Sequence, residues 1–287
     1  LELTDSGQIQ RVVDRVAPDE IYNLAAQSFV HSSFEQPIYA AEVTGLAVAK
    51  ILEALRNAGA PVRFYQASTS ELFGNARISP QDEDTPFHPR SPYAIAKLYA
   101  HHITVNYREA FGLHASCGIL FNHESPVRPA QFITRKVTLA FARMTLGQHQ
   151  PLEVGNLDAA RDWGFAGDYV EGMWRMVQQA EADDYVLATG VAHTVRQLIE
   201  TAAACVDMQI DWRGEGVSTE GLDRRTGKVL VRINPAFYRP ADINLTVGNP
   251  AKAAARLDWR PVVGFEALIR RMVDADLERL RCGRPMA

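Results

Sequence analysis

The sequence predicts an α/β protein: a doubly wound parallel sheet with a smaller C-terminal lobe. Short apolar runs alternate with amphipathic stretches through the first half of the chain, which is the pattern of parallel strands joined by crossover helices. Small and polar residues follow the predicted strands, at the place where open α/β sheets bind ligands. The second half is less regular, and no Gly/Ser-rich linker separates it from the first.

The first half contains three predicted strands and three predicted helices. Val43, Leu46, Ile51 and Leu55 repeat at helical spacing, and Pro92 stands where the first turn of a helix favours proline. The strands are predicted at Glu20–Ala25, Val62–Ala67 and His114–Phe121, and the helices at Gln8–Val16, Ala40–Ala58 and Pro92–Phe111. Candidate ligand-binding segments therefore lie at residues 25–28, 67–74 and 121–128.

The second half mixes helices with short strands. A hairpin is predicted over Gly214–Ile233, with Asp223–Lys228 as its turn. Strands are predicted at Pro151–Val154 and Tyr185–Thr189, and helices at Phe132–Gly147, Gly167–Gln179, His193–Val206, Pro250–Leu257 and Phe265–Leu280.

The composition excludes several classes of protein. The net charge of −4 argues against a general nucleic-acid binder, and no apolar run approaches the roughly 18 residues of a membrane helix. Cys117, Cys205 and Cys282 are odd in number and far apart, which excludes a disulfide scaffold and predicts a reducing, cytoplasmic location. Cys117 is predicted to be a buried strand residue. No spacing of ligands for zinc is present, so no metal is expected.

A Tyr-x-x-x-Lys pair, Tyr93 and Lys97, lies on the third predicted helix. Residues four apart share a helix face, and an ammonium beside a phenol lowers the pKa of the tyrosine. Such a tyrosine can accept a hydroxyl proton while a nicotinamide accepts hydride. The spacing alone is weak evidence, because a partly exposed tyrosine beside a solvated lysine gives the same pattern.

The strand ends strengthen this interpretation. Ala67–Gly74 places a hydroxyl and a carboxylate, Thr69 and Glu71, just after the second strand. A helix N-cap would explain the same residues, but turn residues follow and leave no long helix to cap. Leu24–Ser28 supplies small residues after the first strand, which allow a flat cofactor near the backbone or simply close packing.

With these segments in place, the chain resembles the extended short-chain dehydrogenase/reductases, and within them the GDP-mannose 4,6-dehydratase family. The matching segments span nearly the whole chain: Tyr22–Ser28, Gln66–Gly74, Pro89–Tyr93, Leu120–Pro126, Gly155–Asp158, Arg161–Gly164 and Phe237–Ala241. The resemblance implies a Rossmann-like NADP-binding domain at residues 1–121 and 165–190. It implies a nucleotide-sugar lobe at residues 122–164 and 191–287.

The implied reaction removes water from GDP-α-D-mannose to give GDP-4-dehydro-6-deoxy-D-mannose, with NADP recycled. Tyr93 would accept the proton of the C4 hydroxyl, and Lys97 would lower the pKa of Tyr93 and hold the cofactor ribose. Glu71 would remove the C5 proton and assist the departure of water from C6. Thr69 would hydrogen-bond near the C4 oxygen. A homodimer or homotetramer is also implied.

Further binding residues follow from the resemblance position by position. Family members carry Asp where Glu2 stands. They carry Glu where Asp242 stands, so the ribose or base contact at Asp242 is expected to be altered. The cofactor residues are Glu2, Leu3, Leu24, Ala25, Ala26, Gln27, Ser28, Tyr39, Lys97, His123 and Arg128. The GDP-sugar residues are Asn122, Thr134, Lys136, Gly155, Arg161, Arg239 and Asp242.

One family feature does not occur in this sequence. Family members have a first strand and a Gly-x-x-Gly-x-x-Gly turn that seats the cofactor pyrophosphate on a helix N-terminus. We therefore expect a further N-terminal segment that carries both, with Leu1–Leu3 as the end of a strand.

Two alternatives remain open. A nucleotide-sugar 4-epimerase or 4-reductase shares Tyr-x-x-x-Lys but needs no base for C5, so Glu71 is the discriminating residue. A fragment that binds nucleotide sugar without turnover is the second alternative. Solvated surface charges are expected at Arg256, Arg270, Arg271, Arg279 and Arg281.

Overall fold

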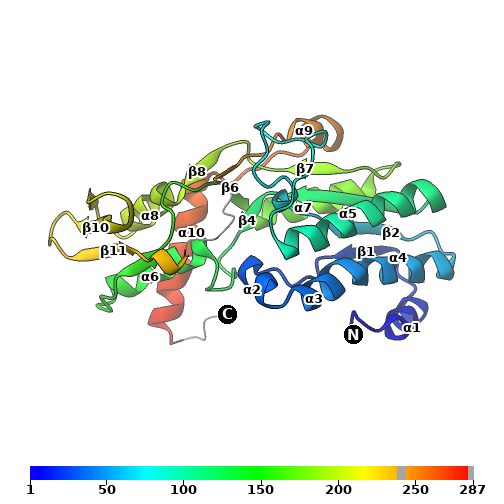
Figure 1. Cartoon of the computed structure of the whole chain (residues 1–287), viewed down its shortest axis with the longest axis horizontal. Coiled ribbons are helices and arrows are strands. Elements are labelled where there is room, and N and C mark those ends of the chain that lie inside the picture. The colour runs from blue at the N-terminus through cyan, green and yellow to red at the C-terminus, as the bar shows by residue number, and fades with distance from the viewer. Residues whose placement is uncertain (238–243, 284–287) are drawn as a thin grey trace. The chain divides into compact units, whose positions relative to one another are not determined.

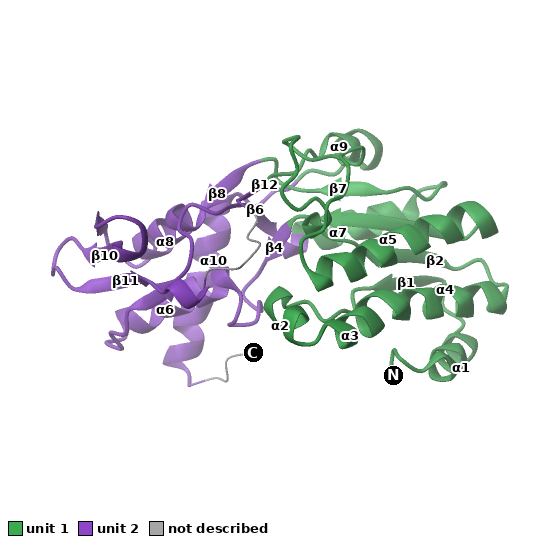
Figure 2. Ribbon diagram, viewed as in Figure 1, with its two compact units in different colours: residues 1–121, 168–190, 246–260 green, residues 122–167, 191–245, 261–287 purple. Residues whose placement is uncertain are grey.

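The computed structural model describes residues 1–237 and 244–283, and the chain divides into two compact units (Figure 2). Unit 1 comprises residues 1–121, 168–190 and 246–260, and unit 2 comprises residues 122–167, 191–245 and 261–287. Residues 246–260 differ from our expectation, which placed them in the substrate lobe. They pack in unit 1 because Ala253, Leu257 and Trp259 join the apolar cluster around Tyr169. The ligand assigned to each domain remains a prediction.

A parallel sheet in the order β1-β2-β3-β7 forms the centre of unit 1. Asn23 pairs with Gln66 at the end of the β1–β2 ladder, so both strands end at the same edge of the sheet. The strands are β1 (Glu20–Asn23), β2 (Arg63–Ala67), β3 (His114–Leu120) and β7 (Tyr185–Leu187).

Helices cover both faces of this sheet (Figure 1). Phe64 of β2 packs with apolar residues of α1 (Ser6–Val16), α4 (Ala47–Ala58) and α5 (Pro92–Phe111). The next residue, Tyr65, points to the opposite face and packs with residues of α7 (Ala166–Gln178) and α9 (Ala251–Leu257). This arrangement confirms the predicted doubly wound α/β fold.

A π-helical segment interrupts the predicted helix at residues 40–58. The chain runs through α2 (Val30–Glu35) and α3 (Pro37–Ala40) into the π segment η1 (Ala41–Leu46), which continues as α4. A Cβ on Gly45 would lie 3.2 Å from the carbonyl oxygen of Ala96 on α5. Glycine therefore allows η1 to approach α5 closely.

Unit 2 has its own core and its own sheets. Trp163, Phe141, Phe265 and Met272 belong to one buried apolar cluster. One sheet has the order β5-β11-β10-β9, and β6 pairs with β4 and β8. The strands are β4 (Asn122–Glu124), β5 (Leu152–Val154), β6 (Ala160–Phe165), β8 (Ala192–Thr194), β9 (Ile210–Arg213), β10 (Glu220–Asp223) and β11 (Val229–Ile233). The remaining elements are α6 (Ile133–Thr145), α8 (Val195–Ala204), α10 (Phe265–Arg281), the 3₁₀ turns η3 (Gly216–Ser218) and η4 (Pro235–Phe237), and β12 (Leu245–Thr246).

The start of the chain differs from its prediction. Leu1–Leu3 lies in no strand; residues 3–4 form a turn instead. The carboxylate of Asp5 then caps α1 by accepting a hydrogen bond from the backbone N–H of Gln8 at 3.0 Å. This cap explains why the helix begins before the predicted Gln8.

Candidate active site

The site begins at the edge of unit 1 where β1 and β2 end. Residues 24–28 leave β1, and residues 68–74 leave β2 through the short 3₁₀ turn η2 (Ser70–Leu72). Thr69 caps this turn, with its Oγ1 accepting a hydrogen bond from the N–H of Glu71 at 3.3 Å. Thr69 is buried and Glu71 is partly exposed. Thr69 and Glu71 therefore form an N-cap, as the alternative interpretation expected, and the same two residues remain the candidates for chemistry.

Helix α5 brings Tyr93 and Lys97 to this edge. Its start is fixed by Pro92 and by Ser91, whose hydroxyl accepts a hydrogen bond from the N–H of Ala94 at 3.1 Å. Because α5 packs against β2 and η2, Tyr93 and Lys97 lie on the helix that borders Thr69 and Glu71.

Lys97 is tied directly to the end of β2. Its ammonium donates a hydrogen bond to the carbonyl oxygen of Ala67 at 2.7 Å, and the side chain is only 3% exposed. Burial disfavours the charged form and lowers the pKa of Lys97 to about 8. Tyr93, one turn earlier, is 9% exposed. The solvated lysine of the alternative interpretation is thus excluded.

The segment after β1 is anchored from two sides. The N–H of Ala25 donates to Oδ1 of Asn23 at 3.3 Å, and the N–H of Gln27 donates to Oγ1 of Thr44 in η1 at 3.1 Å. π-helical turns often occur at functional sites, and this one supplies the hydroxyl that fixes the segment. Leu24 and Ala25 are exposed, so a ligand can reach their backbone.

Two buried polar atoms at this edge fit a ligand with many hydrogen-bonding groups. Oε1 of Gln27 and Oγ of Ser68 find no hydrogen-bond partner among the described residues. Buried polar groups are normally paired, so a nucleotide with ribose hydroxyls suits this edge.

The other cofactor candidates of unit 1 lie near the surface. Tyr39 on α3 is 52% exposed. Glu2 is exposed, and its carboxylate accepts hydrogen bonds from the N–H and Oγ1 of Thr4, both at 2.9 Å; these bonds lower the pKa of Glu2. Leu3 packs against the cluster of α1 and α4.

Unit 2 gathers several of the remaining predicted residues on β4 and α6. Asn122 and His123 are on β4, and Thr134 and Lys136 are on α6. The Lys136 ammonium lies 4.0 Å from the ring centroid of Phe237, and burial lowers the pKa of Lys136.

Thr134 and Arg128 meet at a buried carboxylate. The hydroxyl of Thr134 donates to Oε2 of Glu124 at 2.6 Å, and Nε of Arg128 lies 3.2 Å from the same oxygen. Burial raises the pKa of Glu124. Thr134 is fully buried, and in this structure its hydroxyl holds Glu124.

Gly155 and Arg161 follow β5 and begin β6. A Cβ on Gly155 would lie 2.9 Å from the carbonyl oxygen of Phe237, so glycine permits the approach of that backbone. Arg161 is partly buried and donates from Nη1 to the carbonyl of Ala160 at 2.9 Å. Arg239 and Asp242 lie outside the described residues.

A buried ion pair escaped the sequence analysis. Nε of Arg135 lies 2.7 Å from Oδ1 of Asp276, and both side chains are fully buried. Arg135 also donates to the carbonyls of Pro126 and Arg128, at 2.8 and 2.9 Å. Arg279, expected to be a solvated charge, was predicted wrongly: it is 20% exposed, pairs with Asp276 at 3.7 Å and donates to the carbonyl of Pro126.

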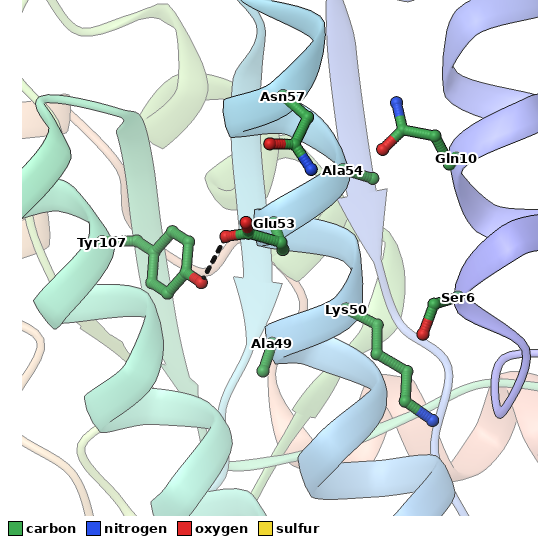
Figure 3. A pocket seen from close by; sticks show the side chains of 8 residues that line it. All are labelled: Ser6, Gln10, Ala49, Lys50, Glu53, Ala54, Asn57 and Tyr107. Atoms are coloured by element: carbon green, nitrogen blue, oxygen red, sulfur yellow. Dashed lines mark hydrogen bonds between the residues drawn. The ribbon is translucent and has the colours of Figure 1, made fainter.

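A surface pocket of about 340 Å³ lies elsewhere in unit 1, among α1, α4 and α5 (Figure 3). The ammonium of Lys50 donates to the carbonyl of Thr4 at 2.7 Å, and Glu53 accepts from the hydroxyl of Tyr107 at 2.9 Å. The lining residues are Ser6, Gln10, Ala49, Lys50, Glu53, Ala54, Asn57 and Tyr107. None of them is a predicted site residue.

The described part of the chain contains no cluster of three or more His, Cys, Asp or Glu residues suited to a metal ion. No helix in it combines the length and apolar character needed to cross a membrane. Cys117 is fully buried in β3, as predicted, and all three cysteines are free.

Solved structures share this fold over nearly the whole chain. RMD from Pseudomonas aeruginosa, solved with NADPH, superposes with a TM-score of 0.83 at 22% identity, covering 97% of this chain and 88% of that one. The dTDP-glucose 4,6-dehydratase DesIV from Streptomyces venezuelae, solved with NAD, gives 0.81 at 20% identity, covering 99% and 80%. UDP-glucose 4-epimerase from Thermus thermophilus, also solved with NAD, gives 0.79 at 27% identity, covering 96% and 83%.

The doubly wound sheet, with Tyr93 and Lys97 on the helix beside its carboxyl edge, gives the chain the same α/β fold as these nucleotide-dependent proteins. The sequence profile of the family described as "GDP-mannose 4,6 dehydratase" matches residues 1–272. The chain belongs to the GDP-mannose 4,6-dehydratase family.

Curated relatives agree over most of their own lengths. GDP-mannose 4,6-dehydratase of Sinorhizobium fredii (strain HH103) is 52% identical over 282 residues, which cover 98% of this chain and 80% of the relative. The Drosophila melanogaster relative is 49% identical, covering 98% and 71%. The Homo sapiens relative is 48% identical, covering 98% and 76%.

Proposed function

We propose that the protein is an NADP-dependent hydro-lyase that converts GDP-α-D-mannose to GDP-4-dehydro-6-deoxy-D-mannose and water. The observation that carries the proposal is the junction of α5 with the end of β2: a buried Lys97 ammonium bonded to Ala67, beside Tyr93, Thr69 and Glu71. Membership of the family and about 50% identity to dehydratases support the same substrate.

A nicotinamide cofactor fits the edge of unit 1. Leu24–Ser28 and Lys97 would hold it. Oγ of Ser68 and Oε1 of Gln27, which have no hydrogen-bond partner among the described residues, would find partners in its hydroxyl and amide groups. Glu2, Leu3, Tyr39, His123 and Arg128 complete the proposed set. When bound, the cofactor supplies a two-electron oxidant for C4 and the matching reductant for C6.

Tyr93 removes the proton from the C4 hydroxyl. The neighbouring ammonium of Lys97 favours the phenolate, because an opposite charge lowers the pKa of a phenol. Thr69, fixed at the end of β2, donates a hydrogen bond to the C4 oxygen. The C4 ketone that results makes the proton on C5 acidic.

Glu71 carries the dehydration. Its carboxylate takes the C5 proton, and the electrons of the C5–H bond form a double bond between C5 and C6. The C6–O bond breaks, and the proton held by Glu71 passes to the departing hydroxyl, which leaves as water. Because Glu71 is partly exposed, it can receive a proton from solvent and return it to C5 when C6 is reduced.

The nucleotide sugar is held by residues of unit 2. Arg161 and Arg239 bind the diphosphate, since the planar guanidinium binds its oxygens bidentately. Asn122, Thr134, Lys136, Gly155 and Asp242 complete the proposed set. We also propose a homodimer or homotetramer, which sedimentation would measure.

Incubation of the protein with GDP-mannose and NADP tests this function. We expect a product that has lost one water and carries a ketone, with no net consumption of NADP. UDP-glucose and dTDP-glucose are the control substrates and should give no product. An epimer of unchanged mass would establish the 4-epimerase instead. Unreacted GDP-mannose, together with stoichiometric consumption of NADPH on a 4-dehydro nucleotide sugar, would establish the 4-reductase.

A further inference from the structure

Two buried amides lie side by side at the end of the first two strands. Asn23 and Gln66 are register partners in β1 and β2 and are 6% and 0% exposed. Nδ2 of Asn23 donates to Oε1 of Gln66 at 2.8 Å. The other polar end of each amide points away from this bond, to a different backbone group.

The amide pair connects the two predicted ligand segments. Oδ1 of Asn23 accepts from the N–H of Ala25 at 3.3 Å, and Nε2 of Gln66 donates to the carbonyl oxygen of Ala67 at 2.9 Å. That carbonyl is also the acceptor for the ammonium of Lys97 at 2.7 Å. An unbroken chain of hydrogen bonds thus runs from Ala25 to Lys97.

The Ala67 carbonyl is saturated by this arrangement. A carbonyl oxygen has two lone pairs, and here one receives Gln66 and the other receives Lys97. Lys97 therefore meets an oxygen whose orientation is fixed by a second donor. In a buried setting such a linked network is rigid.

A role for Asn23 and Gln66 in strand pairing alone does not explain why Gln66 donates to the carbonyl of Ala67. The backbone ladder from Glu20 with Arg63 to Asn23 with Gln66 already sets the register of β1 and β2. Burying an amide costs free energy unless it is fully bonded. Here the donor of Gln66 goes to the one carbonyl that holds Lys97.

We propose that Gln66 is a positioning residue for Lys97: together with Asn23 it fixes the Ala67 carbonyl, and it couples the Ala25 segment of the cofactor edge to the ammonium. The proposal rests on the proposed function in treating Lys97 as catalytic. Its geometric part, the control of Lys97 by Gln66, stands on the hydrogen bonds alone.

Ionisable groups from several elements surround the helix face that carries Lys97. Cys117 of β3 lies on this face, with its Sγ 3.7 Å from the carbonyl oxygen of His101 on α5. Burial holds the pKa of this thiol well above its usual range, so it is uncharged near neutral pH. Glu71 comes from η2, while Tyr93 and His101 lie one turn away on α5.

Replacing Gln66 by glutamate tests the coupling directly. A carboxylate cannot donate to the Ala67 carbonyl and adds a negative charge beside Lys97, which raises the pKa of Lys97 and also of Tyr93. Gln81 provides a matched control. It is a buried glutamine of unit 1 that donates to the carbonyl of Ile78 and accepts from the N–H of Val247, each at 3.0 Å.

The first readout does not depend on activity. The chain has five lysines, Lys50, Lys97, Lys136, Lys228 and Lys252, so an NMR titration with ¹³Cε-labelled lysine resolves each of them, with Lys97→Met as the assignment variant. We expect the Lys97 signal to titrate about one pH unit higher in Gln66→Glu, and at its wild-type pH in Gln81→Glu. An unchanged Lys97 titration in folded Gln66→Glu overturns the proposal.

The second readout is kinetic and uses Gln66→Leu, which removes the donor to Ala67 without placing a charge in the buried strand. We expect kcat for GDP-mannose to fall about tenfold or more, with KM changed less than about threefold. A rise in KM as large as the fall in kcat contradicts a positioning role, and so does the absence of any change in either constant. A wild-type protein that does not turn over GDP-mannose would refute the proposed function and leave the NMR result to decide the coupling.

Discussion

At the level of residues, the main feature of the candidate site is the ammonium of Lys97, which is almost completely buried. A buried ammonium destabilises the folded chain unless it is bonded, and one hydrogen bond to Ala67 offsets only part of that cost. A charge at such a position is expected where chemistry uses it. The buried charge of Lys97 should therefore lower the free energy of unfolding of the protein.

Lys97→Met is expected to stabilise the protein at pH 7 while abolishing turnover. Lowering the pKa of Lys97 from 10.5 to about 8 corresponds to roughly 3 kcal/mol, and the lost hydrogen bond offsets about 1 kcal/mol. Urea unfolding should thus show a gain of about 2 kcal/mol. A variant less stable than wild type at pH 7 would contradict this account.

The pH dependence of that gain has a definite sign. Unfolded chains keep the lysine proton up to pH 10.5, whereas the folded protein releases it near pH 8. The penalty in wild type is therefore complete below pH 8 and disappears as the pH rises toward 10.5. The difference between Lys97→Met and wild type should narrow over this range, and a constant difference would show that burial of charge is not its cause.

The candidate catalytic pair could be named from the sequence, but the hydrogen bonds that support it could not. Tyr93 and Lys97 are four apart on one helix, so their proximity is local. The bond between Asn23 and Gln66 joins residues 43 positions apart and depends on the register of two strands. An amide side chain near the end of each strand was the available signal, since buried polar residues need partners.

At the level of elements, helices with strong end signals were predicted well. Helix α5 begins at Ser91 and Pro92 and ends at Gly112, which adopts a left-handed φ of 68°, and its predicted bounds agree with the structure. β6 was missed because its Ala-Arg-Asp-Trp-Gly-Phe sequence has little strand character by itself. It forms because β4 and β8 flank it, and such pairing is not visible in one segment.

The ion pair between α6 and α10 should dominate the stability of unit 2. Asp276→Ala leaves the buried Arg135 without its counter-ion, which costs about 3–5 kcal/mol. Asp158→Ala is the control in the same unit, because Asp158 is 84% exposed and lies 3.7 Å from Arg196. An exposed pair contributes about 0–1 kcal/mol, so equal losses in the two variants, measured by urea unfolding, would refute the expectation.

At the level of the whole molecule, each unit has its own sheet and core. The proposed function divides the ligands between them: most cofactor residues are in unit 1, and the described candidates for the nucleotide sugar are in unit 2. The two units are defined by how the chain packs. The ligand assigned to each unit comes from the resemblance to the family.

Hydrogen exchange measured with each ligand separately tests the division. NADP should slow amide exchange at residues 24–28 and 67–72, and GDP should slow it at residues 132–136 and 152–163. Protection of residues 132–136 and 152–163 by NADP, or of residues 24–28 and 67–72 by GDP, would contradict the assignment of the two units.

In the proposed mechanism, Glu71 performs the dehydration after Tyr93 and Lys97 have assisted oxidation at C4. Product formed from GDP-mannose in D₂O, analysed by NMR and mass spectrometry, tests it most directly. Wild type should give 6-deoxy product with deuterium at C5, and Glu71→Gln should lose product formation about 100-fold or more. Normal 6-deoxy product with C5 deuterium from Glu71→Gln would contradict the account.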